Sequence, residues 1–250
     1  MSINLDGYGP TAGSYMGGTG ANYNERGYNG NSTTPGGNSG SRSDGIGKNT
    51  SINIASTKSY NGNFMSMCVN NLKAHEGFKN SMYKDQNGNV TVGIGHLLAN
   101  ASMAAALPFT TTRTYHGHGD EQSKEVTVSK SDITNAFNSY KNSASTAPLT
   151  GWHLSNDAVI GQCISDVQNA ETGLRNLYSG YDSFSNSRKT ALVDMAFNLG
   201  IDKLRKGFPK FNAAVNSGDW EAAARESHRD LNQRGDQRNR DTAAQLRSSR

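Results

Sequence analysis

The chain has 250 residues, and its 25 Lys and Arg against 21 Asp and Glu give a formal net charge of +4. This mildly basic balance suits an anionic partner, either acidic cell-wall material or nucleic acid, and does not separate the two. No run of about eighteen apolar residues occurs, and the first residues lack a basic stretch followed by an apolar one, so we expect neither a membrane span nor an ordinary export signal.

The chain has two cysteines, Cys68 and Cys163. They could form one disulfide, but a single pair in a chain of this size is not a disulfide framework. We expect both to be free, buried thiols.

The first 56 residues differ in composition from the rest of the chain. They are rich in Gly, Asn and Ser and contain almost no Leu, Ile, Val or Phe. Such a segment cannot bury enough apolar surface to offset the entropy lost on ordering. We therefore expect residues 1–56 to be a disordered tail and residues 57–250 to fold as one domain, large enough to need no disulfides.

The folded part begins with a helical pattern over residues 61–75, in which apolar side chains recur every three or four positions. Two β-prone segments follow, at residues 82–85 and 90–95. Asn87 and Gly88 lie between them and are a strong hairpin signal, because both tolerate a positive φ angle. The sequence therefore predicts an antiparallel hairpin soon after the first helix.

The remaining segments are mostly helical. An Ala-rich helix is expected over residues 101–106, whereas residues 110–119 are expected to form a polar loop or ribbon. Ser129 with Asp132 resembles a capping box and predicts a helix start. Further helices are expected at residues 129–143, 155–178, 185–199, 203–208, 211–217, 219–229 and 238–247.

Two carboxyl groups stand at different kinds of position. Glu76 falls at the end of the first helix, and Asp85 and Thr91 flank the hairpin turn. Hydrolysis of a glycosidic bond requires one carboxyl that keeps its proton for the leaving oxygen and a second, ionised group on the opposite face. An apolar environment near Phe78 and Phe197 would keep the first protonated, whereas a polar hairpin leaves the second charged. By themselves, however, such carboxylates most often only solvate a surface.

The pattern around these residues resembles the signature of the T-even phage lysozymes. The matching motifs are Glu76-Gly77, Tyr83-Lys84-Asp85 and Thr91-Val92-Gly93-Ile94-Gly95-His96. The resemblance implies that Glu76 is the general acid and that Asp85 and Thr91 hold the attacking water. It also implies that the Gly-rich strand with His96 shapes a small lobe beside the cleft.

Residues 188–200 resemble the long central helix of the same family. The resemblance implies that Phe197 and Asn198 in this helix line the saccharide cleft, and that Leu97 and Arg238 also bind substrate. Arg238 is the best counterpart of the arginine that lies close to the catalytic glutamate.

For that arginine, Arg240 is an alternative after a shift in the preceding loop. The resemblance covers residues 65–246. Residues 101–149 do not align within it, and we expect an insertion near the mouth of the cleft.

The resemblance implies an α+β, mostly helical, lysozyme-like fold of two lobes: a small β-hairpin lobe and a larger helical lobe, joined by the helix at residues 155–178. The implied enzyme is a glycoside hydrolase, an N-acetylmuramidase that cleaves the β-1,4 bond between N-acetylmuramic acid and N-acetylglucosamine by an inverting route. Peptidoglycan is the expected partner; no cofactor and no nucleic acid is implied.

His116 and His118 with His96 could in principle hold a metal, since imidazoles bind zinc well. They lack a nearby cysteine and a suitably spaced third ligand. We therefore expect no metal site.

The composition of residues 1–56 resembles the glycine-rich translocation regions of colicin-like bacteriocins. It predicts a bacteriocin-like toxin made in the cytoplasm without a signal peptide and acting in the periplasm on the cell wall. An immunity protein and an outer-membrane receptor or translocator would be its partners. A phage endolysin or a secreted antibacterial effector with the same activity is the alternative. A non-catalytic glycan-binding homologue is a further alternative, against which the intact Glu76, Asp85 and Thr91 argue.

Overall fold

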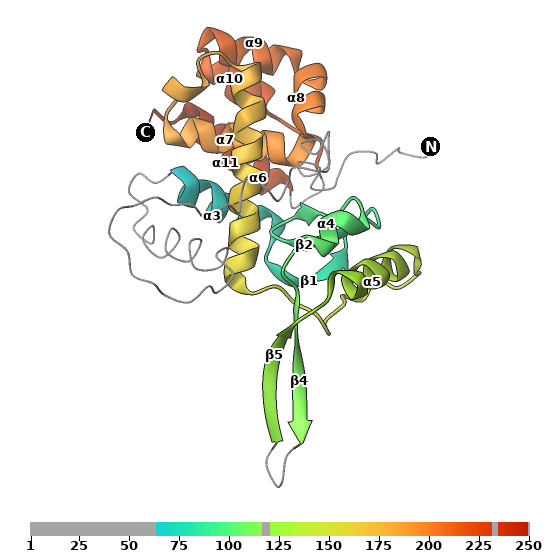
Figure 1. Cartoon of the computed structure of the whole chain (residues 1–250). Coiled ribbons are helices and arrows are strands. Elements are labelled where there is room, and N and C mark those ends of the chain that lie inside the picture. The colour runs from blue at the N-terminus through green and yellow to red at the C-terminus, as the bar shows by residue number, and fades with distance from the viewer. Residues whose placement is uncertain (1–63, 117–120, 232–234, 250) are drawn as a thin grey trace, which may run out of the picture.

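The structure, a computed structural model, describes residues 64–116, 121–231 and 235–249. These residues form two lobes, and a long helix, α6 (Asn156–Leu177), runs from one lobe into the other (Figure 1). The small lobe holds a three-stranded sheet and two helices, and the larger lobe consists of helices. The expected α+β, mostly helical fold of two lobes is confirmed.

The small lobe is built around an antiparallel sheet in the order β1-β2-β3. Its strands are β1 (Lys79–Lys84), β2 (Val90–Gly93) and β3 (His96–Leu97). The turn between β1 and β2 contains Asn87 and Gly88, as predicted, and Gly88 has a φ of +79°. All of β2 is buried, because it is the central strand and α6 packs on it.

Two helices, α4 (Ala101–Ala105) and α5 (Lys130–Asn142), pack on each other in the small lobe. The side chain of Ser129 caps α5 by accepting a hydrogen bond of 3.1 Å from the amide of Asp132. The helix start predicted from these two residues is therefore confirmed.

Helix α6 connects the lobes and contributes to both. Ser155 starts it by accepting a hydrogen bond of 3.1 Å from the amide of Ala158. Val159, Cys163 and Val167 recur at steps of four and are buried in the core. Cys68 and Cys163 are both free and buried, as expected.

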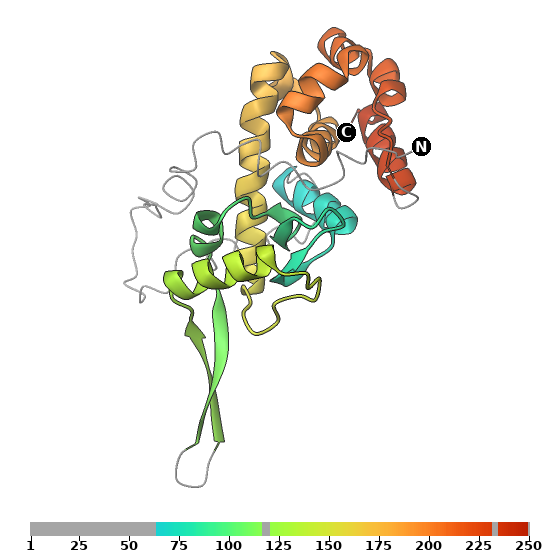
Figure 2. The ribbon, with the colours of Figure 1, turned by 90° about the vertical axis from the view of Figure 1, so that its right-hand side faces the viewer.

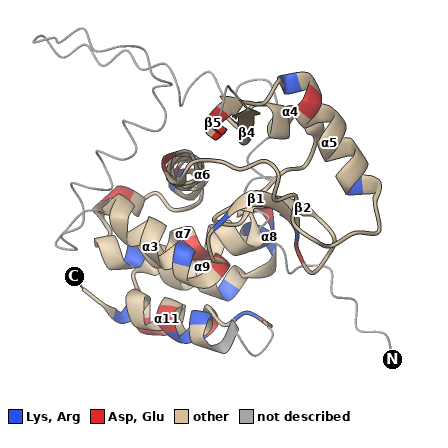
Figure 3. Ribbon diagram, turned by 90° about the horizontal axis from the view of Figure 1, so that it is seen from below, with Lys and Arg blue, Asp and Glu red and all other residues tan. Residues whose placement is uncertain are grey.

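The larger lobe is arranged around α7 (Asn186–Leu199), in which every residue from 190 to 199 is buried. The first described helix, α3 (Phe64–Glu76), packs on one part of α7, and α11 (Gly235–Arg247) packs on another. Figure 3 shows α3, α7 and α11 side by side. The lobe is completed by α8 (Ile201–Gly207), α9 (Pro209–Ser217) and α10 (Trp220–Glu226).

A two-stranded ribbon, β4 (Thr110–His116) and β5 (Glu121–Thr127), projects from the small lobe (Figures 1 and 2). The sequence predicts a polar loop or ribbon for residues 110–119 but misses β5. The reason is physical: β5 is exposed on nearly all of its length, so its sequence lacks the alternation of a half-buried strand.

The helix boundaries differ from expectation at the C-terminal end. Helix α10 ends at Glu226 instead of residue 229, so Arg229 lies after it, and α11 begins at Gly235 instead of residue 238. The expected tail, residues 1–56, lies outside the described residues. None of the described helices is both long and apolar enough to span a membrane.

Candidate active site

Glu76 is the last residue of α3, directly before the chain turns into β1. Gly77 follows with a φ of +81°, a conformation that ends the helix. The Glu76 side chain is 12% exposed, and its Oε1 accepts a hydrogen bond of 2.7 Å from Arg238 Nη1. Gly95 also lies against it, since a Cβ on Gly95 would come within 3.0 Å of Glu76 Cγ. Helix α11 and the Gly-rich segment thus hold Glu76 in place.

Arg238 continues from Glu76 into a buried network of charges. Its Nε lies 3.1 Å from both carboxylate oxygens of Asp194, and Arg229 Nη1 donates to Asp194 Oδ2 at 2.9 Å. The side chains of Asp194 and Arg229 are 0% and 1% exposed. Burial by itself would raise the pKa of Asp194, but the two guanidiniums hold that pKa well below its usual value.

His75 binds the same carboxylate. Its Nδ1 lies 3.1 Å from Asp194 Oδ1, and its Nε2 lies 3.1 Å from Asp241 Oδ2. Burial opposes the charged imidazole, yet the carboxylates of Asp194 and Asp241 raise the pKa of His75 above its ordinary 6.5. These ion pairs form one connected group, the Asp194 cluster, which consists of Glu76, His75, Asp194, Arg229, Arg238 and Asp241.

Asp85 lies in the turn between β1 and β2, in an environment unlike that of Glu76. Its carboxylate accepts hydrogen bonds from the amides of Asn87 and Asn89, at 2.9 and 2.8 Å, and from Asn89 Nδ2 at 3.1 Å. Three donors to one carboxylate fix its orientation. The hairpin therefore presents a carboxylate acceptor held in one direction.

Thr91 and Leu97 are directly opposite each other on β2 and β3. The Thr91 side chain is buried, and its Oγ1 donates to the carbonyl of Asn89 at 3.3 Å. Thr91 is thereby tied to the same loop that orients Asp85. Leu97 is half-buried at the edge of the sheet.

Tyr83 lies within electrostatic reach of both carboxyl groups. Burial first, and then the charges of Glu76 and Asp85, raise the pKa of Tyr83 above its ordinary value of 10. Tyr83 also pairs with Thr91 across the hairpin. The structure therefore brings Glu76, Asp85 and Thr91 together around the β1–β2 hairpin.

The Gly-rich segment is fastened to α6 by its histidine. His96 Nδ1 lies 2.9 Å from Asp166 Oδ2, and Gln162 Nε2 donates to the other carboxylate oxygen at 3.1 Å. A Cβ on Gly93 would lie 3.4 Å from Val159 of the same helix. These contacts fix the small lobe on α6, as the expected supporting role of Gly93, Gly95 and His96 requires.

Two residues expected to contact saccharide are inside the protein. Phe197 is 1% exposed and belongs to the hydrophobic core, and Asn198 is 6% exposed with its Oδ1 accepting from Arg229 Nη1 at 3.4 Å. Both side chains therefore lie in the interior of α7. Their contact with saccharide stays a prediction.

Arg238 and Arg240, the two counterparts considered for the arginine near the glutamate, are clearly separated. Arg238 contacts Glu76, whereas Arg240 is exposed and its Nη2 donates to Gln237 at 2.9 Å. The sequence motifs assign no role to His75, Asp194 or Arg229. A signal existed for Asp194, because it is the one acid in the otherwise apolar centre of α7.

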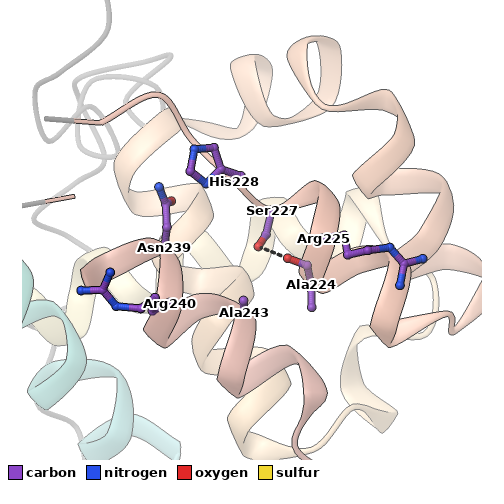
Figure 4. Close-up of a pocket in the computed structure, with 7 residues that line it drawn as sticks. All are labelled: Ala224, Arg225, Ser227, His228, Asn239, Arg240 and Ala243. Carbon is purple, nitrogen blue, oxygen red and sulfur yellow. Dashed lines mark hydrogen bonds between the residues drawn. The ribbon is translucent and has the colours of Figure 1, made fainter. Parts of the chain in front are cut away.

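A pocket between α10 and α11 is separate from this site (Figure 4). Its lining includes Arg225, His228 and Arg240. In Figure 4 the side chains of Arg225 and Arg240 point away from each other, on opposite sides of the pocket. The two guanidiniums therefore do not converge on one ligand position.

No group of three metal-ligating side chains occurs in the part of the chain that the structure describes. His96 is engaged by Asp166, and His116 ends β4. His118 lies outside the described residues.

Comparisons with known proteins agree with the motifs. Residues 73–241 match the family model described as phage lysozyme. A probable T4-type lysozyme 2 of Dictyostelium discoideum is 31% identical over 154 residues, which cover 61% of this chain and 76% of that protein. A crystal structure of a mutant P22 lysozyme has a TM-score of 0.46 at 18% identity, covering 73% of this chain and 97% of that one.

The matches to the family model and to the Dictyostelium protein define the class of protein as a lysozyme-like glycoside hydrolase that acts on peptidoglycan. The chain belongs to the phage lysozyme family.

Proposed function

We propose that the protein is an N-acetylmuramidase that cleaves the β-1,4 bond between N-acetylmuramic acid and N-acetylglucosamine, with Glu76 as the general acid. Asp85 and Thr91 position the attacking water. The supporting observation is the contrast between two neighbouring carboxyl groups: one is mostly buried at a helix end, and the other is held by three hydrogen-bond donors in a polar turn.

In this mechanism Glu76 transfers its proton to the glycosidic oxygen as the bond breaks. The carboxylate that remains is then stabilised by the Arg238 guanidinium, 2.7 Å away. Ionised Asp85 accepts a proton from the water that attacks the opposite face of the sugar. Because the Thr91 hydroxyl donates its hydrogen to Asn89, its oxygen is left to accept a hydrogen bond from that water.

The route is inverting if Asp85 acts through water rather than as a nucleophile. An inverting pair needs carboxyl groups about 6.5 to 9.5 Å apart, against about 5 to 5.5 Å for a retaining pair. NMR of the first-formed product distinguishes the two routes. We expect the α-anomer. A first product of the β-anomer would mean that the route is retaining and that Asp85 acts as a nucleophile.

The test of the function is Glu76→Gln, assayed by turbidity loss of purified peptidoglycan. The amide keeps the size of the side chain but has no acidic proton, so we expect the rate to fall by at least about 100-fold. Glu221→Gln is the matched control, because Glu221 is 64% exposed and pairs only with Arg247 among the described residues. A Glu76→Gln protein that keeps most of its activity would rule out Glu76 as the acid.

Leu97 and Arg238 are the further residues that we propose to bind substrate. Leu97 stands at the sheet edge beside Thr91, and Arg238 beside Glu76. An inactive, glycan-binding homologue is the rival function. Turnover of purified peptidoglycan by the unmodified protein excludes it.

We further propose that the enzyme serves as a bacteriocin-like toxin that acts on the periplasmic cell wall of a target bacterium. Its partners would be an immunity protein and an outer-membrane receptor or translocator. The support is compositional: residues 1–56 are rich in Gly, Asn and Ser, as translocation segments are. An endolysin or a secreted effector would carry out the same hydrolysis without needing that tail.

A further inference from the structure

We propose that His75 and Asp194 are positioning residues of the active site: they hold the Arg238 guanidinium against Glu76 and, through their charges, set the pH above which Glu76 no longer carries the proton that it delivers. The inference rests on the proposed role of Glu76 as general acid. It concerns groups for which the sequence motifs assign no role.

The geometry shows how Asp194 acts on Glu76 through Arg238. A guanidinium is planar and rigid, so fixing one edge fixes the direction of the other N–H groups. Asp194 accepts hydrogen bonds from Nε at 3.1 Å and forms an ion pair with Nη2 at 3.0 Å, and Nη1 donates to Glu76 at 2.7 Å. Asp194 is itself fixed, because Arg229 and Thr242 donate to its Oδ2 at 2.9 and 3.3 Å.

The position of Asp194 beside Arg238 also affects the charge of Glu76. An arginine in contact with a general acid favours the ionised acid, which cannot give a proton. The negative charge of Asp194 offsets the positive charge of Arg238. Without the charge of Asp194, the positive charges of Arg229 and Arg238 would favour ionised Glu76 more strongly.

His75 completes the charge balance of the Asp194 cluster. The ion pairs join three carboxylates, two guanidiniums and one imidazole: those of Glu76, Asp194, Asp241, Arg229, Arg238 and His75. With a protonated imidazole the cluster is neutral, and with a neutral imidazole it carries one excess negative charge. Protonation of His75 therefore works against protonation of Glu76.

His75 is the group of this site whose charge changes near neutral pH. The other ionisable side chains that interact with Glu76 or Asp194 from the packed elements are Tyr83 on β1, Cys68 on α3 and Cys163 on α6. Asp85 in the turn acts on Tyr83, and Lys189 on α7 acts on Cys68. Burial raises the pKa of Tyr83 and of both thiols, so these three stay uncharged at neutral pH. The pKa of His75, in contrast, is raised from 6.5.

The direct test is the pH dependence of hydrolysis by His75→Gln, measured from about pH 4 to pH 9. Glutamine preserves hydrogen bonding but not the positive charge, so we expect the alkaline fall in rate to move to higher pH by about half a unit or more. Asp194→Asn should move it to lower pH, because the charge of Arg238 is then no longer offset. His153→Gln is the control: His153 is 35% exposed, pairs with Glu125 of the ribbon, and should leave the profile unchanged.

A second measurement does not depend on activity. NMR titration of the His75 imidazole in the unmodified protein and in Glu76→Gln measures the effect of the Glu76 charge on His75. This effect must equal that of the His75 charge on Glu76, because coupling between two sites is reciprocal. Loss of the Glu76 charge should lower the pH at which His75 titrates. Superimposable rate profiles for His75→Gln and the unmodified enzyme, or an unchanged His75 titration, would overturn the proposal. If the unmodified protein hydrolyses nothing, the proposed function fails, and the titration still decides the coupling.

Discussion

At the scale of single residues, Asp194 combines full burial with charge. Moving a carboxylate out of water is costly, and here two arginines, a histidine and a threonine compensate that cost. Such a network is easily broken by removing one partner, because the others then remain buried without compensation. Asp194 is therefore expected to matter for stability as well as for the position of Arg238.

The first prediction is that Asp194→Asn lowers the free energy of unfolding by about 3 to 5 kcal/mol at neutral pH. The pKa of Asp194 in the folded protein is well below its ordinary 3.8, so its stabilisation is present above that value and is lost as the pH falls towards the folded-state pKa. The difference between the two proteins should therefore shrink in acid. Urea unfolding at a series of pH values measures it.

Asp182→Asn serves as the control for this comparison. Asp182 is 72% exposed and pairs with a half-exposed Arg175, so its loss should cost less than about 1 kcal/mol. An equally small effect for Asp194→Asn would contradict the buried network.

The second prediction separates placement of Glu76 from backbone strain. Gly95 has a φ of +65°, and an added Cβ would lie 3.0 Å from Glu76 Cγ; Gly218 has a φ of +75° with nothing within 4 Å of the added atom. Both Gly→Ala variants carry similar backbone strain, about 1 to 2 kcal/mol. Gly95→Ala should also displace the Glu76 side chain, and its kcat should fall by about 10-fold or more, whereas Gly218→Ala keeps its rate. Similar rates for the two variants would show that Gly95 does not position Glu76.

At the scale of elements, the β4–β5 ribbon divides its charges between its two faces. Residues opposite each other in an antiparallel pair share a face. One face carries Arg113 opposite Lys124, and the other carries Thr112 opposite Glu125. Apart from the base of the ribbon, these side chains are exposed, so they add little to the core.

The third prediction is that the ribbon can be shortened without loss of the fold. Since Thr112 and Glu125 are directly opposite, replacing residues 113–124 by Asn-Gly closes a two-residue hairpin. Because Phe109 and Val128 at the base stay buried, the thermal midpoint should change by only a few degrees, about the effect of 1 kcal/mol or less. Hydrolysis of peptidoglycan should persist. If the shortened protein is stable but inactive, the ribbon takes part in substrate binding.

At the scale of the whole molecule, the open question is delivery. The composition of residues 1–56 predicts a segment that adds nothing to the folded domain, and those residues lie outside the described part of the chain. Among the described residues, those that we propose for hydrolysis all follow position 70, so we expect hydrolysis without the tail.

The fourth prediction concerns a protein that lacks residues 1–56. Its thermal midpoint and its rate on purified peptidoglycan should equal those of the full chain. In the toxin role, the truncated protein should no longer kill living Gram-negative cells from outside, because the outer membrane separates it from the wall. Equal killing by both forms would remove the tail from the delivery route, and no killing by either would favour an endolysin.

The sequence alone determined the local features of this protein. The helix that ends at Glu76, the Asn87-Gly88 turn and the caps at Ser129 and Ser155 all follow from short-range rules of helix and turn formation. The motif from Glu76 to His96 was sufficient to indicate the family, because its residues lie on consecutive elements. These features depend on neighbours within a few positions, which a sequence displays directly.

Only the tertiary structure decided what surrounds Glu76. The Asp194 cluster joins α3, α7, the segment after α10, and α11, and no sequence spacing shows that these four come together. The same applies to Phe197: α7 is buried on every side, so its apolar pattern does not show which face is turned towards a cleft. Long-range packing of helices fixes the surroundings of Glu76 and the orientation of Phe197. The same packing brings two arginines, a histidine and a buried acid to Glu76.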